Sequence, residues 1–374
     1  MEGVQFVNTG LILIFLIVML GPFFIRRIEK NLEIFLFVCG VAALTVSGFL
    51  PGTEVFGWNA RIVTEALTAP LVITSVFGIP VGIVQIVLFF GLVMYIWFRE
   101  IQQGIEWLTA RMSLHTIIFV IIVLAGLLSS IISAILAAII LVEMVCALPM
   151  NRGDKVTVII IACFSIGLGA ALTPLGEPLS TITVANLSGA PYYAGFSYLF
   201  DLLGVYILPG VIAFGIIGVL LYNRSGLSQE SLVCHVRRDT LPQVVIRALK
   251  VYIFIMGLIF LGEGLKPLIL QYVVNIPAGG LYWANSVSAV LDNATLAAAE
   301  ISPLLSVFQI KSALMGLIIA GGMLIPGNIP NIISAGKLGI TSREWAKIGV
   351  PVGILTMGVY FLVIFIPAYL VPAT

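Results

Sequence analysis

The chain has 374 residues, of which 60% are hydrophobic and only 9% are charged. A soluble protein of this size could not bury so much apolar surface, so the composition excludes a soluble globular protein. The formal net charge of +1 also excludes a strongly basic nucleic-acid binder. Apolar runs of membrane-spanning length recur from one end to the other and predict an all-α polytopic membrane protein.

Eight apolar segments are predicted to cross the bilayer as helices. They are residues 8–25, 32–50, 70–98, 156–187, 197–222, 248–265, 312–335 and 348–370. The first has no basic region before it, so we interpret it as a retained helix rather than a cleaved signal. Residues 98–108 have one charged and one apolar face and are predicted to form a helix lying along the membrane surface.

Two further apolar segments, residues 115–148 and 282–310, could each form one long helix or a re-entrant hairpin. The distribution of basic residues favours hairpins. Five basic clusters are Arg26, Arg27 and Lys30; Arg99 and Arg111; Arg152 and Lys155; Arg224, Arg237, Arg238, Arg247 and Lys250; and Lys337, Arg343 and Lys347. The positive-inside rule places all five in the cytoplasm only if each hairpin enters and leaves on one face. The first hairpin then opens to the cytoplasm, the second opens to the outside, and both termini are predicted outside.

The two hairpin segments carry related motifs, SAILAA at residues 133–138 and SAVLDN at residues 288–293. Each is followed by two prolines spaced four apart, Pro174 and Pro178 in one case and Pro326 and Pro330 in the other. The serine-to-proline distances are 174 − 133 = 41 and 326 − 288 = 38 residues. A duplicated unit with a helix break is typical of transporters built from repeats. With the topology above, we predict inverted repeats, two re-entrant hairpins and two discontinuous helices.

This pattern divides the chain into four regions. Residues 1–112 are predicted to hold scaffold helices and the interfacial helix, and residues 113–222 the first hairpin, its broken helix and the following span. Residues 223–247 are predicted to form a cytoplasmic linker. Residues 248–374 would then hold a scaffold helix, the second hairpin, its broken helix and the last span.

The two proline-containing breaks are predicted to bind a cation. Each proline removes a backbone donor and disfavours helix at the preceding residue, so the segments LTPLGEPLST (172–181) and IPGNIPNIIS (325–334) should unwind. Unwound backbone is tolerated at membrane depth only where it is packed in protein or lines a cavity. Freed carbonyls, hydroxyls and amide oxygens are ligands suited to Na⁺. The alternative is a pair of proline kinks that serve packing alone.

A carboxylate in the bilayer core costs about 2.5–3.5 kcal/mol, so the acids near these motifs are candidate functional groups. They are Glu143, Glu177, Asp292 and Glu300, and no Lys or Arg lies within the same motifs. Such acids are expected to take up a proton or a metal cation. We expect Asp292 to be the principal cation ligand or proton carrier, and Glu177 to do the corresponding work in the first unit, with Na⁺ at both. A hydrogen-bonded structural acid or a hairpin-tip cap is the alternative for Asp292.

Polar residues are expected to complete the two sites. Those around Asp292 are Ser288, Asn293, Thr295, Asn328 and Asn331, and those around Glu177 are Ser129, Ser130, Ser133, Thr173, Ser180 and Thr181. Glu143 and Glu300 are expected near the hairpin mouths, either on a proton path or in a solvated, structural position. Glu65, Asp201 and Glu263 lie near predicted span ends and are expected at the interface.

These motifs resemble those of the ion transporter superfamily, especially its branch of NhaD-type sodium/proton antiporters and arsenite permeases. The resemblance is carried by SAVLDN at 288–293, TPLGEP at 173–178, GNIPNII at 327–333, and GITSREW at 339–345 followed by GVP at 349–351. Within that branch the short chain is most similar to predicted cation transporters of prokaryotes. The resemblance implies elevator-like alternating access, commonly in a homodimer, in the inner membrane of a prokaryotic cell. One departure is Ala137 and Ala138, where members of the NhaD type often carry an Asp-Asn pair, and this difference counts against a two-acid mechanism.

The leading hypothesis is secondary transport of a monovalent cation, most simply Na⁺ exchanged for H⁺. One acid can bind either ion but not both, and this competition would couple the two fluxes. The alternative is a Na⁺-coupled symporter of a small anion, a carboxylate or an oxyanion, held by helix N-termini. An enzyme is not expected, because GFS at 195–197 and His115 are predicted on opposite faces and no ATP-binding loop is present. The expected partners are the lipid bilayer, small ions and a second copy of the chain, with no nucleic acid and no cofactor beyond the transported ions.

Overall fold

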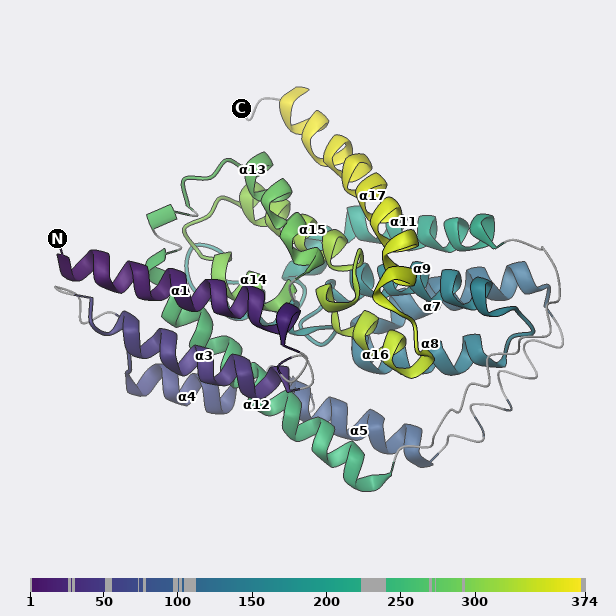
Figure 1. The fold of residues 1–374 in the computed structure, drawn as a ribbon, viewed down its shortest axis with the longest axis horizontal. Coiled ribbons are helices and arrows are strands. Elements are labelled where there is room, and N and C mark those ends of the chain that lie inside the picture. The colour runs from purple at the N-terminus through teal and green to yellow at the C-terminus, as the bar shows by residue number, and fades with distance from the viewer. Residues whose placement is uncertain are drawn as a thin grey trace.

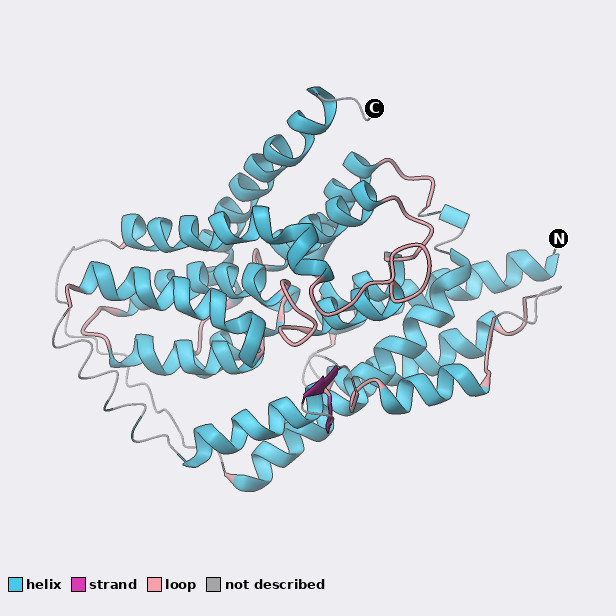
Figure 2. Ribbon diagram, turned by 180° about the vertical axis from the view of Figure 1, so that it is seen from behind, coloured by secondary structure: helices cyan, strands magenta, loops and turns pink. Residues whose placement is uncertain are grey.

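The computed structural model describes residues 2–25, 28, 31–50, 56–72, 74–76, 79–96, 100, 103, 112–222, 240–268, 271–272, 274–290 and 293–370. The described chain is helical apart from one pair of short strands (Figures 1 and 2). Its first half contains α1 (Glu2–Phe24), α3 (Leu32–Ser47), α4 (Ala60–Thr68), β1 (Thr74–Val76), β2 (Ile79–Val81), α5 (Ile83–Ile96), α7 (Leu114–Ile132), α8 (Ala134–Ala147), α9 (Arg152–Ala170), α10 (Pro178–Asn186) and α11 (Tyr198–Leu221). The second half contains α12 (Leu241–Leu268), α13 (Ala278–Ala284), the 3₁₀ helix η2 (Asn285–Ala289), α14 (Asn293–Glu300), α15 (Val307–Gly321), the 3₁₀ helix η3 (Ile325–Gly327), α16 (Ile329–Leu338) and α17 (Ser342–Leu370).

Helices α1, α3, α4, α5 and α12 form one group, which we call the scaffold (Figure 1). Its centre is the pair α3–α12, which packs at very short distance because glycines face each other across it. A Cβ added at Gly40 would lie 2.5 Å from the carbonyl oxygen of Gly257, and one added at Gly264 would lie 2.5 Å from the amide nitrogen of Leu44. Small residues allow helix backbones to approach in this way in a membrane.

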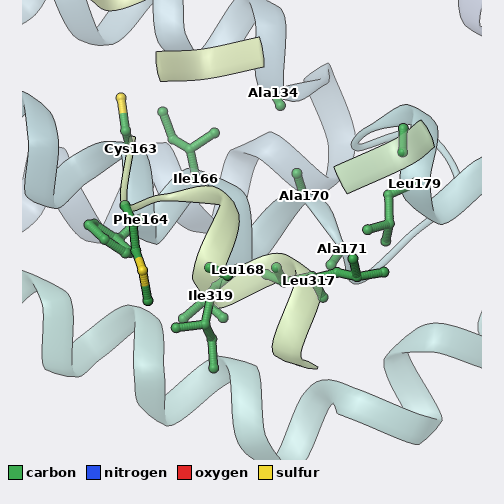
Figure 3. Packing of buried hydrophobic residues seen from close by; sticks show 14 of the residues in the cluster. Ala134, Cys163, Phe164, Ile166, Leu168, Ala170, Ala171, Leu179, Leu317 and Ile319 are labelled. Carbon is green, nitrogen blue, oxygen red and sulfur yellow. The ribbon is translucent and has the colours of Figure 1, made fainter. Parts of the chain in front are cut away.

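The remaining helices form a second group around α9, which contacts α7, α8, α11, α15, α16 and α17. Almost every side chain of α9 is buried, as expected for a helix that is apolar on all sides. Phe164 and Leu168 of α9 lie in the same packed cluster as Leu317 and Ile319 of α15 (Figure 3). We call this group the core group, since it contains both broken helices.

The two halves of the core group are packed crosswise. The short helix α10, which follows the first break, lies against α14 of the second half. The short helix α16, which follows the second break, lies against α8 of the first half (Figure 1). Each break is therefore held against a helix from the other half of the chain.

Local sequence signals explain where these helices begin. The side chains of Asn59, Ser113 and Asn151 accept hydrogen bonds from backbone amides in the first turns of α4, α7 and α9. Ser306 and Gln309 form a capping box at the start of α15. Such caps satisfy orphan donors at helix ends, which fixes the point at which each helix starts.

The structure agrees with several predicted spans and corrects one. The predicted span 197–222 matches α11, and both segments with paired prolines are indeed interrupted. The predicted span 70–98 is wrong in its first half, where β1 and β2 pair antiparallel and α5 begins only at Ile83 (Figure 2). The backbone of Gly82 approaches so closely that an added Cβ would lie 2.3 Å from the carbonyl oxygen of Pro70. The predicted interfacial helix at 98–108 lies outside the described residues except for Glu100 and Gln103.

Within the described residues, five helices are long and apolar enough to cross a membrane. They are Leu114–Ile132, Arg152–Ala170, Tyr198–Leu221, Leu241–Leu268 and Ser342–Ala368. Shorter apolar helices occur at Val4–Val18, Glu33–Ser47, Ala134–Ala147 and Val307–Gly321. These helices support assignment to the membrane, while the number of crossings and the side of each terminus remain predictions.

The close contact between α7 and α9 gives a prediction about stability. A Cβ at Gly169 would lie 1.8 Å from the carbonyl oxygen of Gly126, whereas a Cβ at Gly336 of α16 would meet nothing within 4 Å. We expect Gly169→Ala to lower the free energy of unfolding by about 1–3 kcal/mol through overpacking. We expect Gly336→Ala to be neutral or to raise it by up to about 1 kcal/mol, through helix propensity. Unfolding in detergent micelles measures both, and equal stability of the two variants would contradict the packing described.

Candidate functional site

The two breaks have the same length and the same construction. Helix α9 ends at Ala170 and the N-cap of α10 is Glu177, a separation of 177 − 170 = 7 residues. Helix α15 ends at Gly321 and the N-cap of α16 is Asn328, a separation of 328 − 321 = 7 residues. Both N-cap residues have extended backbone angles. Glu177 therefore corresponds to Asn328, and not to Ile329 as the alignment of prolines predicts.

A side chain at the third residue after each N-cap satisfies the end of the preceding helix. Ser180 Oγ donates to the carbonyl oxygen of Ala170 at 3.2 Å. Asn331 Nδ2 donates to the carbonyl oxygens of Gly321 and Leu324, both at 2.8 Å. Buried carbonyls left without a donor would each cost free energy, so these side chains stabilise the interrupted helices. Ser180 and Asn331, which the sequence suggested as ion ligands, thus have a structural task as well.

Glycine precedes each N-cap because the chain folds tightly back on the helix it has just left. A Cβ at Gly176 would lie 1.9 Å from the carbonyl oxygen of Ala170, and one at Gly327 would lie 2.6 Å from that of Gly321. Only a residue without a side chain fits such an approach. The glycine places the following N-cap residue deep in the core group.

Glu177 is the acid at the centre of the first break. It is only 3% exposed, and it makes no side-chain capping bond to α10. Its Oε2 instead accepts a hydrogen bond of 3.4 Å from Nδ2 of Asn293, the first residue of α14, which is 2% exposed. The carboxylate of the first unit therefore faces a residue that was expected beside Asp292 in the second. The crossed packing of α10 and α14 produces this contact.

The junction between α7 and α8 contacts the first break. The backbone amide of Ala134 donates to the carbonyl oxygen of Gly176 at 2.7 Å, and Thr173 Oγ1 donates to the carbonyl oxygen of Ser130. Ser133 joins α7 to α8 with φ of +79°, a conformation that L residues seldom adopt. Its hydroxyl is buried and has no hydrogen-bond partner among the described residues. Strained backbone and an unsatisfied buried hydroxyl are both features that concentrate at functional sites.

Other predicted residues of the first site have local partners. Ser129 Oγ donates to the carbonyl oxygens of Gly126 and Ile166 at 2.6 and 3.1 Å, and so helps to join α7 to α9. Ser130 Oγ donates within its own helix. Thr181 Oγ1 contacts the carbonyl oxygens of Pro174 and Glu177 at 2.7 and 3.3 Å. The hydroxyl oxygens could still present lone pairs to a cation, because each is bonded here as a donor.

The second break is polar in a different way. Asn328 and Ser288 are 2% and 0% exposed, and a Cβ at Gly327 would lie 2.5 Å from the carbonyl oxygen of Ser288. Nδ2 of Asn328 and Oδ1 of Asn331 are buried without a hydrogen-bond partner among the described residues. Asp292 and the side chain of Thr295 lie outside the described residues, so the roles assigned to them stay predictions.

Glu143 and Glu300 are both buried and both have donors. Lys337 of α16 lies 3.4 Å from Glu143 of α8, and Asn285 Nδ2 donates to Glu300 at 2.7 Å. No basic residue lies within the sequence motif of Glu143, yet a lysine from a distant part of the chain lies beside its carboxylate. Lys337 follows it by 194 residues, and it comes into reach because α16 packs against α8. The pair fixes one side of the crossed packing.

The described residues contain no cluster of three or more His, Cys, Asp or Glu side chains that could hold a metal ion. Transition metals favour such clusters. What the breaks offer is one buried carboxylate, several hydroxyls and main-chain carbonyls, which is chemistry suited to an alkali cation or a proton.

The capping bonds give a prediction that separates structure from ion binding. Asn331→Ala removes two hydrogen bonds, to the buried carbonyl of Gly321 and the partly buried carbonyl of Leu324, whereas Ser180→Ala removes one that is longer. At about 1–3 kcal/mol for each carbonyl left unsatisfied, Asn331→Ala should be the more destabilising variant even without added salt. Thermal unfolding in detergent at low and high Na⁺ measures this. A stability loss seen only at high Na⁺ would instead make Asn331 an ion ligand without the capping role.

Comparison with known proteins gives one assignment. The sequence matches the family described as "Protein of unknown function (DUF1646)" over residues 8–366. No curated protein matches the sequence. Because the family match extends over nearly the whole chain, this membrane-type helical protein with two equivalent broken helices belongs to the DUF1646 family.

Proposed function

We propose that the protein is a secondary active transporter that exchanges Na⁺ for H⁺. The observation that carries the proposal is Glu177, a buried carboxylate at the N-cap of a helix that resumes after a seven-residue break. A buried carboxylate needs a compensating cation or a proton, because its charged form is costly in a medium of low dielectric constant. Competition of the two for one group is the simplest way to couple their movements.

The surroundings of Glu177 support an alkali cation. The hydroxyl of Ser133, the carbonyl oxygens of the break and the hydroxyl of Thr181 belong to segments that contact the main chain of the break at Gly176 and Glu177. These are hard oxygen ligands, and Na⁺ sites in transporters are built from unwound backbone of this kind. Asp292, next to Asn293 in the sequence, is proposed as the second acid.

Two structural features support inverted repeats and alternating access. The breaks are of equal length, with matching N-cap, glycine and capping positions. The short helices that follow them are exchanged crosswise between the halves. We propose that the scaffold stays in place while the core group moves across the membrane and carries the ion, as in an elevator. A homodimer in the inner membrane of a prokaryotic cell, with both termini outside, remains part of this proposal.

A second candidate is a Na⁺-coupled symporter of a small carboxylate or oxyanion. The observation in its favour is Asn328 Nδ2, a buried donor without an acceptor among the described residues, at the N-terminus of α16. Helix N-termini attract anions. In this alternative, the first break holds Na⁺ and the second holds the anion.

Replacement of Glu177 tests the leading function. We expect Glu177→Gln to lower Na⁺-dependent proton movement in proteoliposomes by at least about tenfold, equivalent to about 1.4 kcal/mol, since the amide cannot exchange a proton for a cation. Asp292→Asn is expected to act in the same direction. Asp201→Asn, at an exposed acid in the first turn of α11, is the matched control and should transport normally.

Two outcomes would change the proposal. Wild-type rates in Glu177→Gln, in protein that elutes as a single species in detergent, would remove Glu177 from the mechanism. Wild-type protein that moves no protons with Na⁺, Li⁺ or K⁺, but binds an anion more tightly when Na⁺ is present, would favour the symporter.

A further inference from the structure

A cavity of about 220 Å³ lies where the scaffold meets the core group. Glu65 and Arg61 of α4 and Glu263 and Lys266 of α12 line it from the scaffold side. The end of α10 and the region after α14 line it from the other side, with Asn186 and Ser302 among the residues. Glu65 and Glu263, which the sequence placed at separate span ends, are thus brought to one opening.

A narrower cavity of about 20 Å³ shares part of this lining and extends it inward. Glu65, Glu263 and Ala185 belong to both cavities, and the inner one also reaches Thr181 of α10. The hydroxyl of Thr181 contacts the carbonyl oxygens of Pro174 and Glu177 at 2.7 and 3.3 Å. The inner cavity therefore reaches α10 at Thr181, which contacts the main chain of the first break.

The outer cavity is lined by both basic and acidic side chains, whereas the charged side chains that line the inner cavity are acidic. At the outer one, Arg61 lies 3.9 Å from Glu65, and Lys266 lies 3.2 Å from Glu263. In each pair the basic side chain is the more exposed, at 86% against 36% and at 41% against 26%. Of the described residues that line the inner cavity, Glu65 and Glu263 are the charged ones. A cation moving inward would leave the basic groups behind and remain beside the acids.

The size of the inner cavity also limits which ions can enter it. A volume of about 20 Å³ accommodates about one water molecule or a small dehydrated ion, by the usual requirement of about 10–15 Å³ for a water. A carboxylate or an oxyanion such as phosphate is too large for it. The walls beyond the acids are apolar, with Ile182, Ile255 and Ile259 among them, so the field of the two carboxylates is weakly screened there.

We propose that the two joined cavities are the entrance through which the cation reaches the first break, with Glu65 and Glu263 as the groups that attract it. In the orientation that the basic residues predict, the ends of α10 and α12 that line this opening would lie on the outer face of the membrane. The inference depends on the proposed cation transport at Glu177, and it adds the route and the residues that select for charge. Glu65 and Glu263 attract the ion at the entrance, and they are not ligands of the ion at the first break.

The first test measures transport. In proteoliposomes, the double replacement Glu65→Gln and Glu263→Gln is expected to raise the Na⁺ concentration for half-maximal rate by about tenfold, as for a cleft that loses its focused field, with little change in the maximal rate. The control Asp201→Asn removes one exposed acid away from the cavities and should leave both quantities unchanged. A purely structural role of the two acids would lower the maximal rate together with the yield of folded protein.

The second test does not depend on transport. Ala185→Cys, in a chain whose four native cysteines are replaced, puts a thiol at the junction of the two cavities. A cationic methanethiosulfonate reagent should modify it faster than an anionic one of similar size, and the preference should disappear when Glu65 and Glu263 are Gln. The absence of a preference when Glu65 and Glu263 are present would overturn the inference, whatever the flux.

Normal sodium affinity in the double variant would also overturn the inference, but it would leave the proposed transport at Glu177 unaffected. Wild-type protein without cation-coupled flux would instead overturn the proposed function.

Discussion

The structure depends on one constraint: a helix interrupted inside lipid must find partners for its free backbone groups within the protein. The chain meets this constraint twice by the same means. A glycine brings the backbone back towards the helix end, and a polar side chain three residues beyond the N-cap donates to the carbonyls left behind. The core group can therefore contain unwound main chain, and it can place an N-cap side chain among the packed helices.

The two breaks use this shared construction for different chemistry. In the first, the N-cap position holds a carboxylate that reaches across to Asn293 of the other half. In the second, the same position holds Asn328, which is neutral and has an amide donor to offer. The crossed packing of α10 with α14 and of α16 with α8 makes each break a joint product of both halves. Two breaks that are far apart in the sequence thus lie in one packed group of helices.

Much of this arrangement could be predicted from the sequence, because its signals are local. Apolar periodicity and length predicted most of the helices, and paired prolines predicted both breaks. The cost of a charge in lipid identified Glu177 as a candidate group, whereas the burial of Glu143 and Glu300 was not predicted. Alignment of the prolines pairs the wrong residues of the two breaks. The N-cap residues Glu177 and Asn328 occupy equivalent positions, and the prolines do not.

What remained hidden depends on contacts between distant segments. Lys337 meets Glu143 across 194 residues, and Asn293 meets Glu177 across 116. Neither contact could be predicted from the sequence around the residues involved. The strands β1 and β2 were hidden for another reason, because a short apolar run rich in β-branched residues can form either a strand or part of a helix. The meeting of Glu65 with Glu263 likewise needed α4 and α12 to be placed side by side.

The glycine contacts between α3 and α12 have a mechanical consequence. The backbones of α3 and α12 approach closely at Gly40, Gly257 and Gly264. Such close packing opposes sliding of one helix along the other, so we expect α3 and α12 to move as one unit. The opposite side of α12 contacts α10 and α14 less extensively than α3, and the two cavities lie beside these contacts, although a Cβ at Gly262 would still lie 2.8 Å from the carbonyl oxygen of Ala298. Gliding there breaks fewer van der Waals contacts per ångström of travel than gliding along α3 would. If the core group moves relative to the scaffold, we expect the movement to take place at the interface of α12 with α10 and α14, beside the two cavities.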